Sequence, residues 1–191
     1  MLSLRPKVLR RGERLRSNMI LITTQPGSER AALAEVLDAL FVLDQRPIMY
    51  DTGARGSFVI RSRASLPLMI ERLRQYPTRS IYHVYPLNTI LKPLKVEDII
   101  SEIIELCCRL LPQGTSLAVR CRRRLNPYVT HSEAFERLVG QAILENFSPR
   151  GIKVDLENPD VIIMIHLYRE LVGIGASPPS WIIRKRSRWD T

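Results

Sequence analysis

The chain has 191 residues, a formal net charge of +10 and a sequence pI near 10.1. Hydrophobic residues make up 45% and charged residues 25% of it, which is the balance of a folded protein and excludes disorder as the default. No apolar run reaches the ~18 residues of a membrane-spanning helix, and no apolar segment of a signal peptide follows the basic N-terminus. Excess positive charge attracts polyanions, so nucleic acid is the first partner to consider. An anionic membrane surface, an acidic protein or a basic surface without a partner are the alternatives.

The three cysteines are Cys107, Cys108 and Cys121. They form no CxxC pair and no set with histidines at zinc-finger spacing, so we expect no metal ion and no cofactor. Cys107 and Cys108 lie inside an apolar run, which is typical of buried thiols. Because nothing indicates a disulfide framework, we expect a reducing, cytoplasmic compartment.

Residues 1–17 are predicted to form a basic N-terminal arm that is disordered, because little in them is apolar enough to be buried. Their charges are Arg5, Lys7, Arg10, Arg11, Arg14 and Arg16 against the single acid Glu13. Three interpretations stay open. The segment is an arm that binds RNA, a flexible tail, or a product of a start assigned too early, since Met19 opens the first strand pattern.

Residues 18–86 are predicted to form a ferredoxin-like domain. β-rich runs indicate strands, and apolar residues at helical spacing indicate helices. The predicted order is strand Met19–Thr23, helix Ala31–Phe41, strand Ile48–Tyr50, strand Phe58–Ile60, helix Leu66–Leu73 and strand Ser80–Tyr85. This β-α-β-β-α-β order is that of the ferredoxin-like fold. The proline-containing stretch Pro86–Pro93 is predicted to be an irregular linker.

Residues 95–176 are predicted to form a second, α/β domain, which gives an α+β protein overall. Its predicted elements are helix Val96–Leu111, strand Thr115–Cys121, a helix from Thr130 or His131 to Phe147, strand Ile152–Asp155, central strand Val161–Leu167 and hairpin strand Leu171–Ala176. Gly173 and Gly175 within a strand pattern indicate a bulge or a close backbone approach. Residues 177–191 are predicted to be a basic C-terminal tail whose segment Trp181–Ile183 packs on the body.

An arginine-rich strand end is the most informative feature of the second half. The strand runs out through Arg120 into Arg122, Arg123 and Arg124, and a helix then begins near His131. Arginine offers fork-shaped donors, and the free N–H groups of a helix start favour anions, so this geometry suits a phosphate. The alternative is a solvated loop whose arginines pair with Glu133 and Glu136.

The same stretch resembles the THUMP domain of tRNA-modifying proteins. The matching motifs are Val119-Arg120-Cys121-Arg122-Arg123, Thr130-His131-Ser132-Glu133, Val139-Gly140, the segment Val154–Asp160 and Val172-Gly173-Ile174. The resemblance covers about residues 95–176. The preceding half is similar to the ferredoxin-like domain that usually precedes THUMP.

The resemblance implies binding to the acceptor end of tRNA. The residues that carry this expectation are Arg120, Arg122, Arg123, His131, Ser132 and Arg137, and Arg124 adds charge. The loop Arg124–Tyr128 departs from the family, which often has a glycine and a histidine there, so the contact geometry of this loop stays open. Tyr128 is placed either to stack on a base or to pack in the turn.

The sequence carries no catalytic signature, so we expect no enzyme activity. It has no GxGxxG, no pyrophosphate loop and no zinc-deaminase motif. The three histidines are scattered, and His83 and His166 are interpreted as packed or surface residues.

The stand-alone arrangement resembles the eukaryotic tRNA acetylation adaptor. The expected function is therefore to bind tRNA and present it to a separate RNA cytidine acetyltransferase for cytidine N4-acetylation. One alternative is a general RNA- or ribosome-associated scaffold. The other is a small tRNA-modifying enzyme that uses His131 and Glu133.

Overall fold

The computed structural model describes residues 6–124 and 126–185. They form one nine-stranded sheet in the order β2-β3-β1-β4-β8-β7-β5-β6, with β9 paired to β4. The elements are β1 (Arg14–Thr24), α1 (Glu29–Leu40), β2 (Ile48–Asp51), β3 (Ser57–Arg61), α2 (Leu66–Gln75), β4 (Ile81–Leu91), α3 (Val96–Leu110), β5 (Ser116–Arg123), α4 (Ser132–Phe147), β6 (Lys153–Val154), β7 (Val161–Leu167), β8 (Val172–Ser177) and β9 (Ile183–Arg184), with 3₁₀ turns at Ser148–Arg150 and Pro179–Trp181. None of the helices in this described part is both long and apolar enough to cross a membrane.

The first half has the predicted β-α-β-β-α-β order. Its antiparallel strands lie in the order β2-β3-β1-β4, as in a ferredoxin-like fold. Because strand side chains alternate between faces, Ile20 and Ile22 of β1 pack under α1 and α2, and Met19 and Leu21 point to the opposite face. The predicted strand at Met19–Thr23 is therefore confirmed.

The second half builds on β5 and β7, which run parallel, and on the β7–β8 hairpin. Leu117 and Val119 of β5 and Ile163 and Ile165 of β7 form a core with α3 and α4. The predicted α+β fold class is confirmed, and the predicted hairpin after the central strand is present.

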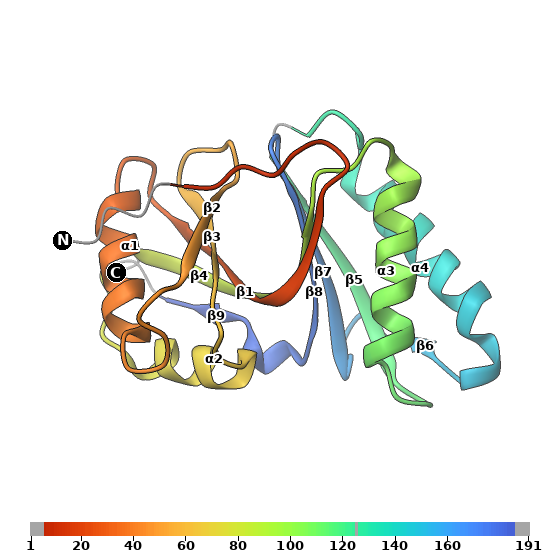
Figure 1. The fold of residues 1–191 in the computed structure, drawn as a ribbon. Coiled ribbons are helices and arrows are strands. Elements are labelled where there is room, and N and C mark those ends of the chain that lie inside the picture. Colours follow the sequence, from red (N-terminus) through yellow and green to blue (C-terminus); the bar gives the residue numbers. More distant parts are fainter. Residues whose placement is uncertain (1–5, 125, 186–191) are drawn as a thin grey trace.

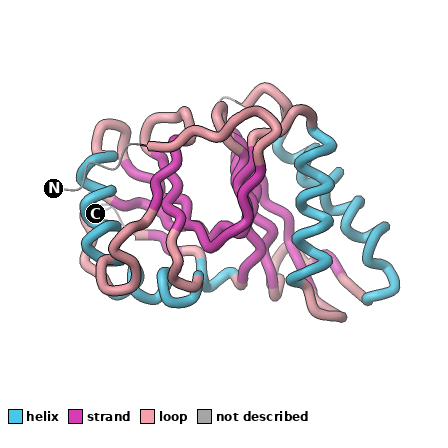
Figure 2. Tube along the Cα trace, viewed as in Figure 1, coloured by secondary structure: helices cyan, strands magenta, loops and turns pink. Residues whose placement is uncertain are grey.

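The sheet is strongly curved, and all four α-helices cover its outer face (Figures 1 and 2). A separate apolar cluster fills the inner face between the two halves. Its buried members are Leu9, Met19, Leu21, Tyr50, Val59, Tyr85, Leu87, Ile90, Met164, Tyr168 and Leu171. The two halves are therefore joined through a shared interior, and residues of β4 and β7 face one another across it.

The prediction of a linker at Pro86–Pro93 is wrong, because β4 continues to Leu91 and pairs with strands of both halves. Pro86 falls between the segment of β4 that pairs with β9 and the segment that pairs with β8, so its missing N–H interrupts neither of these ladders. The predicted close approach at Gly175 is real. A Cβ atom there would collide with the carbonyl oxygen of Pro86.

The prediction of a disordered arm is also wrong for the described residues of 1–17. Lys7 forms backbone hydrogen bonds with Met49 (2.9 Å) and Asp51 (3.0 Å) beside β2, and Gly12 donates to the carbonyl of Lys92 (2.8 Å). Leu9 is buried in the interior cluster. Figure 1 shows this segment crossing the open side of the curved sheet, so it spans the two halves. Residues 1–5 lie outside the described part.

Arg14 and Arg16 belong to β1 and bind a buried carboxylate. Glu102 of α3 accepts hydrogen bonds from Arg14 (2.8 Å), Arg16 (2.8 and 2.9 Å) and the Thr89 hydroxyl (2.9 Å). The sequence counts these arginines among the charges of the N-terminal arm and does not show that a carboxylate of α3 faces them. They hold the two halves together instead.

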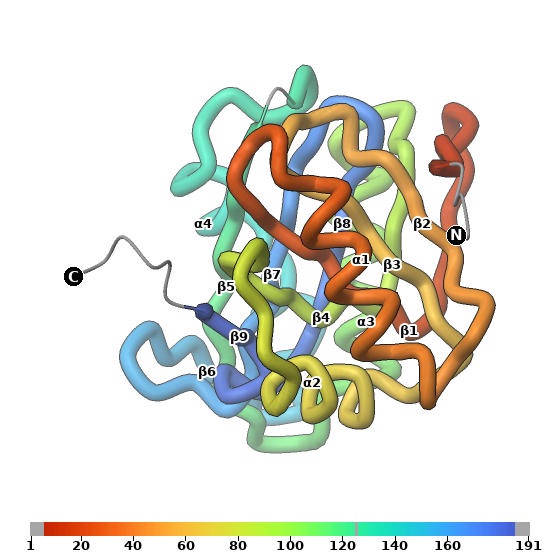
Figure 3. Tube along the Cα trace, turned by 90° about the vertical axis from the view of Figure 1, so that its left-hand side faces the viewer, coloured from red at the N-terminus to blue at the C-terminus, as the bar shows by residue number. Residues whose placement is uncertain are grey.

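The predicted C-terminal tail is in part a strand. Ile183 and Arg184 form β9, which pairs with Val84 and His83 of β4 although it lies about a hundred residues further along the chain (Figure 3). Trp181 packs against the core of the first half, as predicted. Residues 186–191, which carry the rest of the basic cluster, lie outside the described part.

Candidate nucleic-acid interface

β5 positions the arginines because its side chains alternate between an apolar face and a face that carries basic residues. Leu117, Val119 and Cys121 enter the core under the helices. Arg122 follows the opposite parity and lies beside His166 of β7 on the inner face. Arg122, Arg123 and Arg124 are exposed at the strand end, so their guanidinium groups reach solvent.

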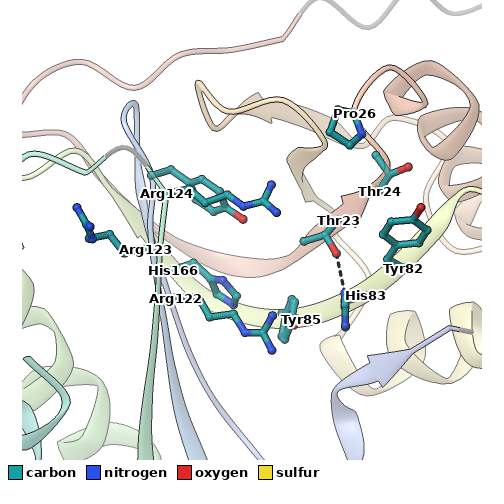
Figure 4. A pocket seen from close by; sticks show the side chains of 11 residues that line it. Thr23, Thr24, Pro26, Tyr82, His83, Tyr85, Arg122, Arg123, Arg124 and His166 are labelled. Carbon is teal, nitrogen blue, oxygen red and sulfur yellow. Dashed lines mark hydrogen bonds between the residues drawn. The ribbon is translucent and has the colours of Figure 1, made fainter. Parts of the chain in front are cut away.

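A pocket of about 420 Å³ opens where these arginines meet the first half of the chain. Figure 4 shows Arg123 and Arg124 on one side of it, Thr23 and His83 on the other, and Arg122 with Tyr85 between them. The pocket is lined by Thr23, Thr24, Pro26, Tyr82, His83, Tyr85, Arg122, Arg123, Arg124, His166 and Tyr168. It therefore draws on β1 and β4 from one half and on β5 and β7 from the other.

Aromatic rings form a row along the pocket. His83 and Tyr85 are two residues apart on β4, with ring centroids 5.6 Å apart. His166 in β7 and Tyr168 just after it repeat this spacing, and the His166 and Tyr85 rings lie 4.5 Å apart. The guanidinium carbon of Arg122 stands 5.4 Å from the centre of the Tyr85 ring, a cation–π contact.

Burial favours the neutral form of both histidines of this row. It lowers the pKa of the His166 imidazole to about 3, with further lowering by Arg122 and His83. Burial also lowers the pKa of His83, and Arg122 and Arg184 add to the effect. The Nδ1 atom of His83 lies 3.0 Å from the Thr23 hydroxyl. Neutral imidazoles offer one donor and one acceptor nitrogen each, so the pocket floor is polar without being charged.

Two buried polar atoms of the floor have no hydrogen-bond partner among the described residues. They are the Tyr85 hydroxyl and the Nε2 atom of His166. Both side chains are about 1% exposed. Because buried polar atoms are nearly always paired, these two have the chemistry to receive a polar ligand or ordered water.

Arg124 fixes the rim of the pocket. Its backbone N–H donates to the carbonyl of Leu167 (2.7 Å), and its guanidinium donates to the carbonyl of Arg55 in the first half (3.3 Å). The following loop is organised by Asn126, whose side-chain oxygen accepts from the N–H of Tyr128 (2.9 Å).

Tyr128 stabilises the loop and does not form an open surface on which a base could stack. Its hydroxyl donates to the carbonyl of Pro93 (2.7 Å), and its ring packs against the core of the second half. Of the two roles left open for this residue, turn packing is the one that the structure shows.

Arg120 and Arg137 lie at a different place, in a groove of about 690 Å³ between the β5 edge and α4. Arg120 donates to the carbonyl oxygens of Leu156 (2.9 Å) and Val119 (3.2 Å). Glu136 accepts from the backbone N–H of Cys121 (2.6 Å) and so covers the open strand edge. The predicted binding residues therefore divide between this groove and the pocket.

The start of α4 lies beside the strand end. His131 is the exposed residue before the helix, Ser132 is its first residue, and Cys121 near the end of β5 carries a buried thiol. Burial raises the pKa of that thiol to about 12, so Cys121 is not a nucleophile at neutral pH. Within the described ranges, Arg122, Arg123 and Arg124 form no ion pair with Glu133 or Glu136, and no cluster of ligands for a metal ion occurs.

His83, Tyr85, His166 and Tyr168 were not among the predicted site residues. The signal that points to them is the repeated spacing His83-Val84-Tyr85 and His166-Leu167-Tyr168. On a strand this spacing places both rings of a pair on one face. The sequence alone does not reveal that the two strands face the same pocket.

The arginine-bearing strand end lies in the part of the chain that matches a known domain family. Residues 94–176 match the THUMP domain family model, which agrees with the motifs found in the sequence. No match was found among curated proteins.

Solved structures share the fold across both halves. PH1313 from Pyrococcus horikoshii Ot3 superposes with a TM-score of 0.64 at 16% identity, over 89% of this chain and 56% of that one. TrmN from Thermus thermophilus gives 0.57 at 21% identity, over 88% and 46%. A 4-thiouridine synthetase, solved as an RNA complex with bound ATP, gives 0.56 at 15% identity, over 88% and 42%. The chain thus spans about half the length of these proteins, or less.

Proposed function

We propose that this protein binds tRNA on its arginine-bearing face and acts as an adaptor that presents the tRNA to a separate modification enzyme. The observation that carries the proposal is the convergence of Arg122, Arg123 and Arg124 at the mouth of the inter-half pocket, beside the start of α4. Guanidinium groups and a helix start both favour phosphate oxygens.

The comparisons support the RNA-binding part of this proposal. The second half is a THUMP domain, and one protein of the same fold, a 4-thiouridine synthetase, was solved with RNA. By analogy with the family we propose the acceptor end of tRNA as the bound region. The proposed contacts are Arg120, Arg122, Arg123, Arg124, His131, Ser132 and Arg137.

An adaptor role is favoured over a catalytic one because the described side chains offer little for catalysis. His131 and Glu133 are two residues apart at the start of α4, where side chains diverge around the helix. We propose cytidine N4-acetylation as the reaction served and an RNA cytidine acetyltransferase as the partner. Co-purification tests this: a protein that recruits no acetyltransferase, and whose loss leaves tRNA acetylcytidine unchanged, has another role.

A binding titration tests the RNA-binding part directly. Wild-type protein is titrated against tRNA with and without its 3′ CCA end, at two salt concentrations, beside an Arg120→Ala/Arg122→Ala/Arg123→Ala variant. Specific binding is expected to fall steeply with salt, to weaken without the CCA end and to drop in the variant.

A charge-matched control separates these arginines from net charge. Arg30, Arg63 and Arg109 are exposed on other parts of the fold, so an Arg30→Ala/Arg63→Ala/Arg109→Ala variant removes the same charge elsewhere. Equal losses in the two triple variants, with no dependence on the CCA end, would mean a generic basic protein. Association with ribosomes or proteins that survives nuclease treatment would favour the scaffold alternative.

A further inference from the structure

The inter-half pocket combines three features that a solvated arginine patch does not need. It has a row of aromatic rings, a neutral polar floor and a basic mouth. Its volume of about 420 Å³ lies within the range of about 300–1,000 Å³ typical of small-ligand sites. A base-paired helix is too wide for such a pocket, whereas one splayed-out nucleotide is of suitable size.

The floor favours a nucleobase over a phosphate. The Tyr85 hydroxyl and the Nε2 atom of His166 are buried and unpartnered within the described residues, and neither side chain carries a positive charge at neutral pH. A phosphate offers acceptors only, whereas the edge of a base offers both donors and acceptors to match a hydroxyl and a neutral imidazole. A ligand that pairs these atoms removes the cost of leaving them unsatisfied.

The walls and mouth suit the rest of a nucleotide. The half-buried His83 ring and the exposed planar guanidinium of Arg122 provide flat surfaces of the kind on which unpaired bases stack. Arg123 and Arg124 stand at the mouth, where a phosphate of the same nucleotide would lie (Figure 4).

We infer that this pocket receives one unpaired nucleotide of the bound RNA, with the base edge on Tyr85 and His166 and the phosphate at Arg123 and Arg124. The inference rests on the proposed function, because it concerns RNA held on the same face. It adds a place where the protein reads an unpaired base rather than the phosphate backbone alone.

The test compares two RNA hairpins that share one stem. One hairpin is blunt, and the other carries a short single-stranded 3′ extension. Wild-type protein should bind the extended hairpin more tightly. Tyr85→Phe keeps the ring and removes only the unpartnered hydroxyl. It should weaken binding of the extended hairpin by about 3- to 10-fold, the value of one hydrogen bond, and leave blunt-hairpin binding unchanged.

Tyr76→Phe is the matched control, because Tyr76 lies outside the pocket beside Arg72. Equal effects of the two variants, or a Tyr85→Phe variant that binds both hairpins like wild type, would contradict the inference that this pocket receives a nucleotide. If wild-type protein binds neither hairpin, the proposed function fails as well. If wild-type protein binds both hairpins equally and the arginine variant binds neither, RNA binding is supported but the nucleotide pocket is not.

A second measurement uses wild-type protein alone and does not depend on how a variant folds. The extension carries 4-thiouridine as its unpaired residue, and the complex is crosslinked by light and digested. Crosslinked peptides from β4 or from the β7–β8 hairpin support the pocket. Crosslinks confined to the Arg120–Arg137 groove would place the unpaired nucleotide there and overturn the inference.

Discussion

Arg16 of β1 binds Glu102 of α3 through both carboxylate oxygens, at 2.9 Å from Nε to Oε1 and 2.8 Å from Nη2 to Oε2. The Glu102 side chain is fully buried, so the pair ties the first strand of one half to the first helix of the other. A bidentate pair of this kind fixes both distance and orientation. The relation between the halves, on which the inter-half pocket depends, thus has a specific ionic anchor.

Removal of Arg16 is expected to destabilise the protein. Burial raises the pKa of Glu102, but hydrogen bonds from Arg16, Arg14 and Thr89 outweigh it and hold the pKa below its ordinary value. Arg16→Ala leaves that carboxylate with fewer partners, and we expect a loss of about 1–3 kcal/mol in the free energy of unfolding, because Arg16 is partly exposed. Urea denaturation measures it. An equal loss in Arg11→Ala, an exposed residue of the preceding segment, would contradict a specific pair.

Gly175 should be irreplaceable even by alanine. A Cβ atom at this position would collide with the carbonyl oxygen of Pro86 in β4, which is backbone and has little room to move. Gly175→Ala is expected to cost about 1–3 kcal/mol, as overpacking does. Gly140 of α4 is the control, since a Cβ there meets nothing within 4 Å. Gly140→Ala should stabilise the helix by about 0.5–1 kcal/mol. Thermal unfolding that ranks the two variants the other way would refute this.

The local elements could be read from the sequence because each carries its own periodicity. Met19 to Thr23 form a β-rich apolar run, and this pattern predicts a strand. The arginine-bearing strand end was equally predictable, since Arg122, Arg123 and Arg124 follow Cys121, the last apolar residue of the strand pattern.

The long-range relations could not be read in this way. Glu102 and Arg16 are 86 residues apart, and no sequence pattern near either residue predicts that the two form a pair. His83 and His166 looked scattered because their meeting depends on β4 and β7 facing one another across the inner face of the curved sheet. Pro86 suggested a linker because proline is rare inside strands. It is tolerated in β4 because it falls between two hydrogen-bonded ladders, and the sequence does not show that gap.

Stability should depend on pH through His166. In the unfolded chain this imidazole has its ordinary pKa near 6.5, whereas burial lowers the folded value to about 3. As pH falls below about 6.5, the unfolded state therefore binds a proton that the folded state does not bind. The free energy of unfolding consequently decreases towards pH 3. The half-buried His83 acts in the same direction.

Urea midpoints at pH 7.5 and pH 5.5 measure this effect. Wild-type protein should be less stable at pH 5.5, and His166→Gln should show a smaller difference between the two pH values. His131→Gln replaces an exposed histidine and should keep the wild-type dependence. If the His166 variant loses as much stability on acidification as wild type does, the buried neutral imidazole is not the source.

The salt dependence of tRNA binding should distinguish individual arginines of β5. Arg123 is exposed at the pocket mouth and makes no side-chain hydrogen bond within residues 6–124 and 126–185, so its guanidinium is available for a phosphate. Arg120 already donates to the carbonyl oxygens of Val119 and Leu156. Each phosphate contact contributes about one unit to the slope of log K against log salt. Arg123→Ala should therefore reduce the slope by about one unit and Arg120→Ala by less.

Titrations at several salt concentrations give these slopes, with Arg30→Ala on α1 as the control for loss of one charge. The control should leave the slope close to that of wild type, since Arg30 does not line the pocket and is not expected to contact a phosphate of the bound RNA. A slope that changes equally in the Arg123 and Arg30 variants would mean that the whole basic surface, and not the end of β5, holds the RNA. In that case the arrangement of arginines around the pocket would have no special part in binding.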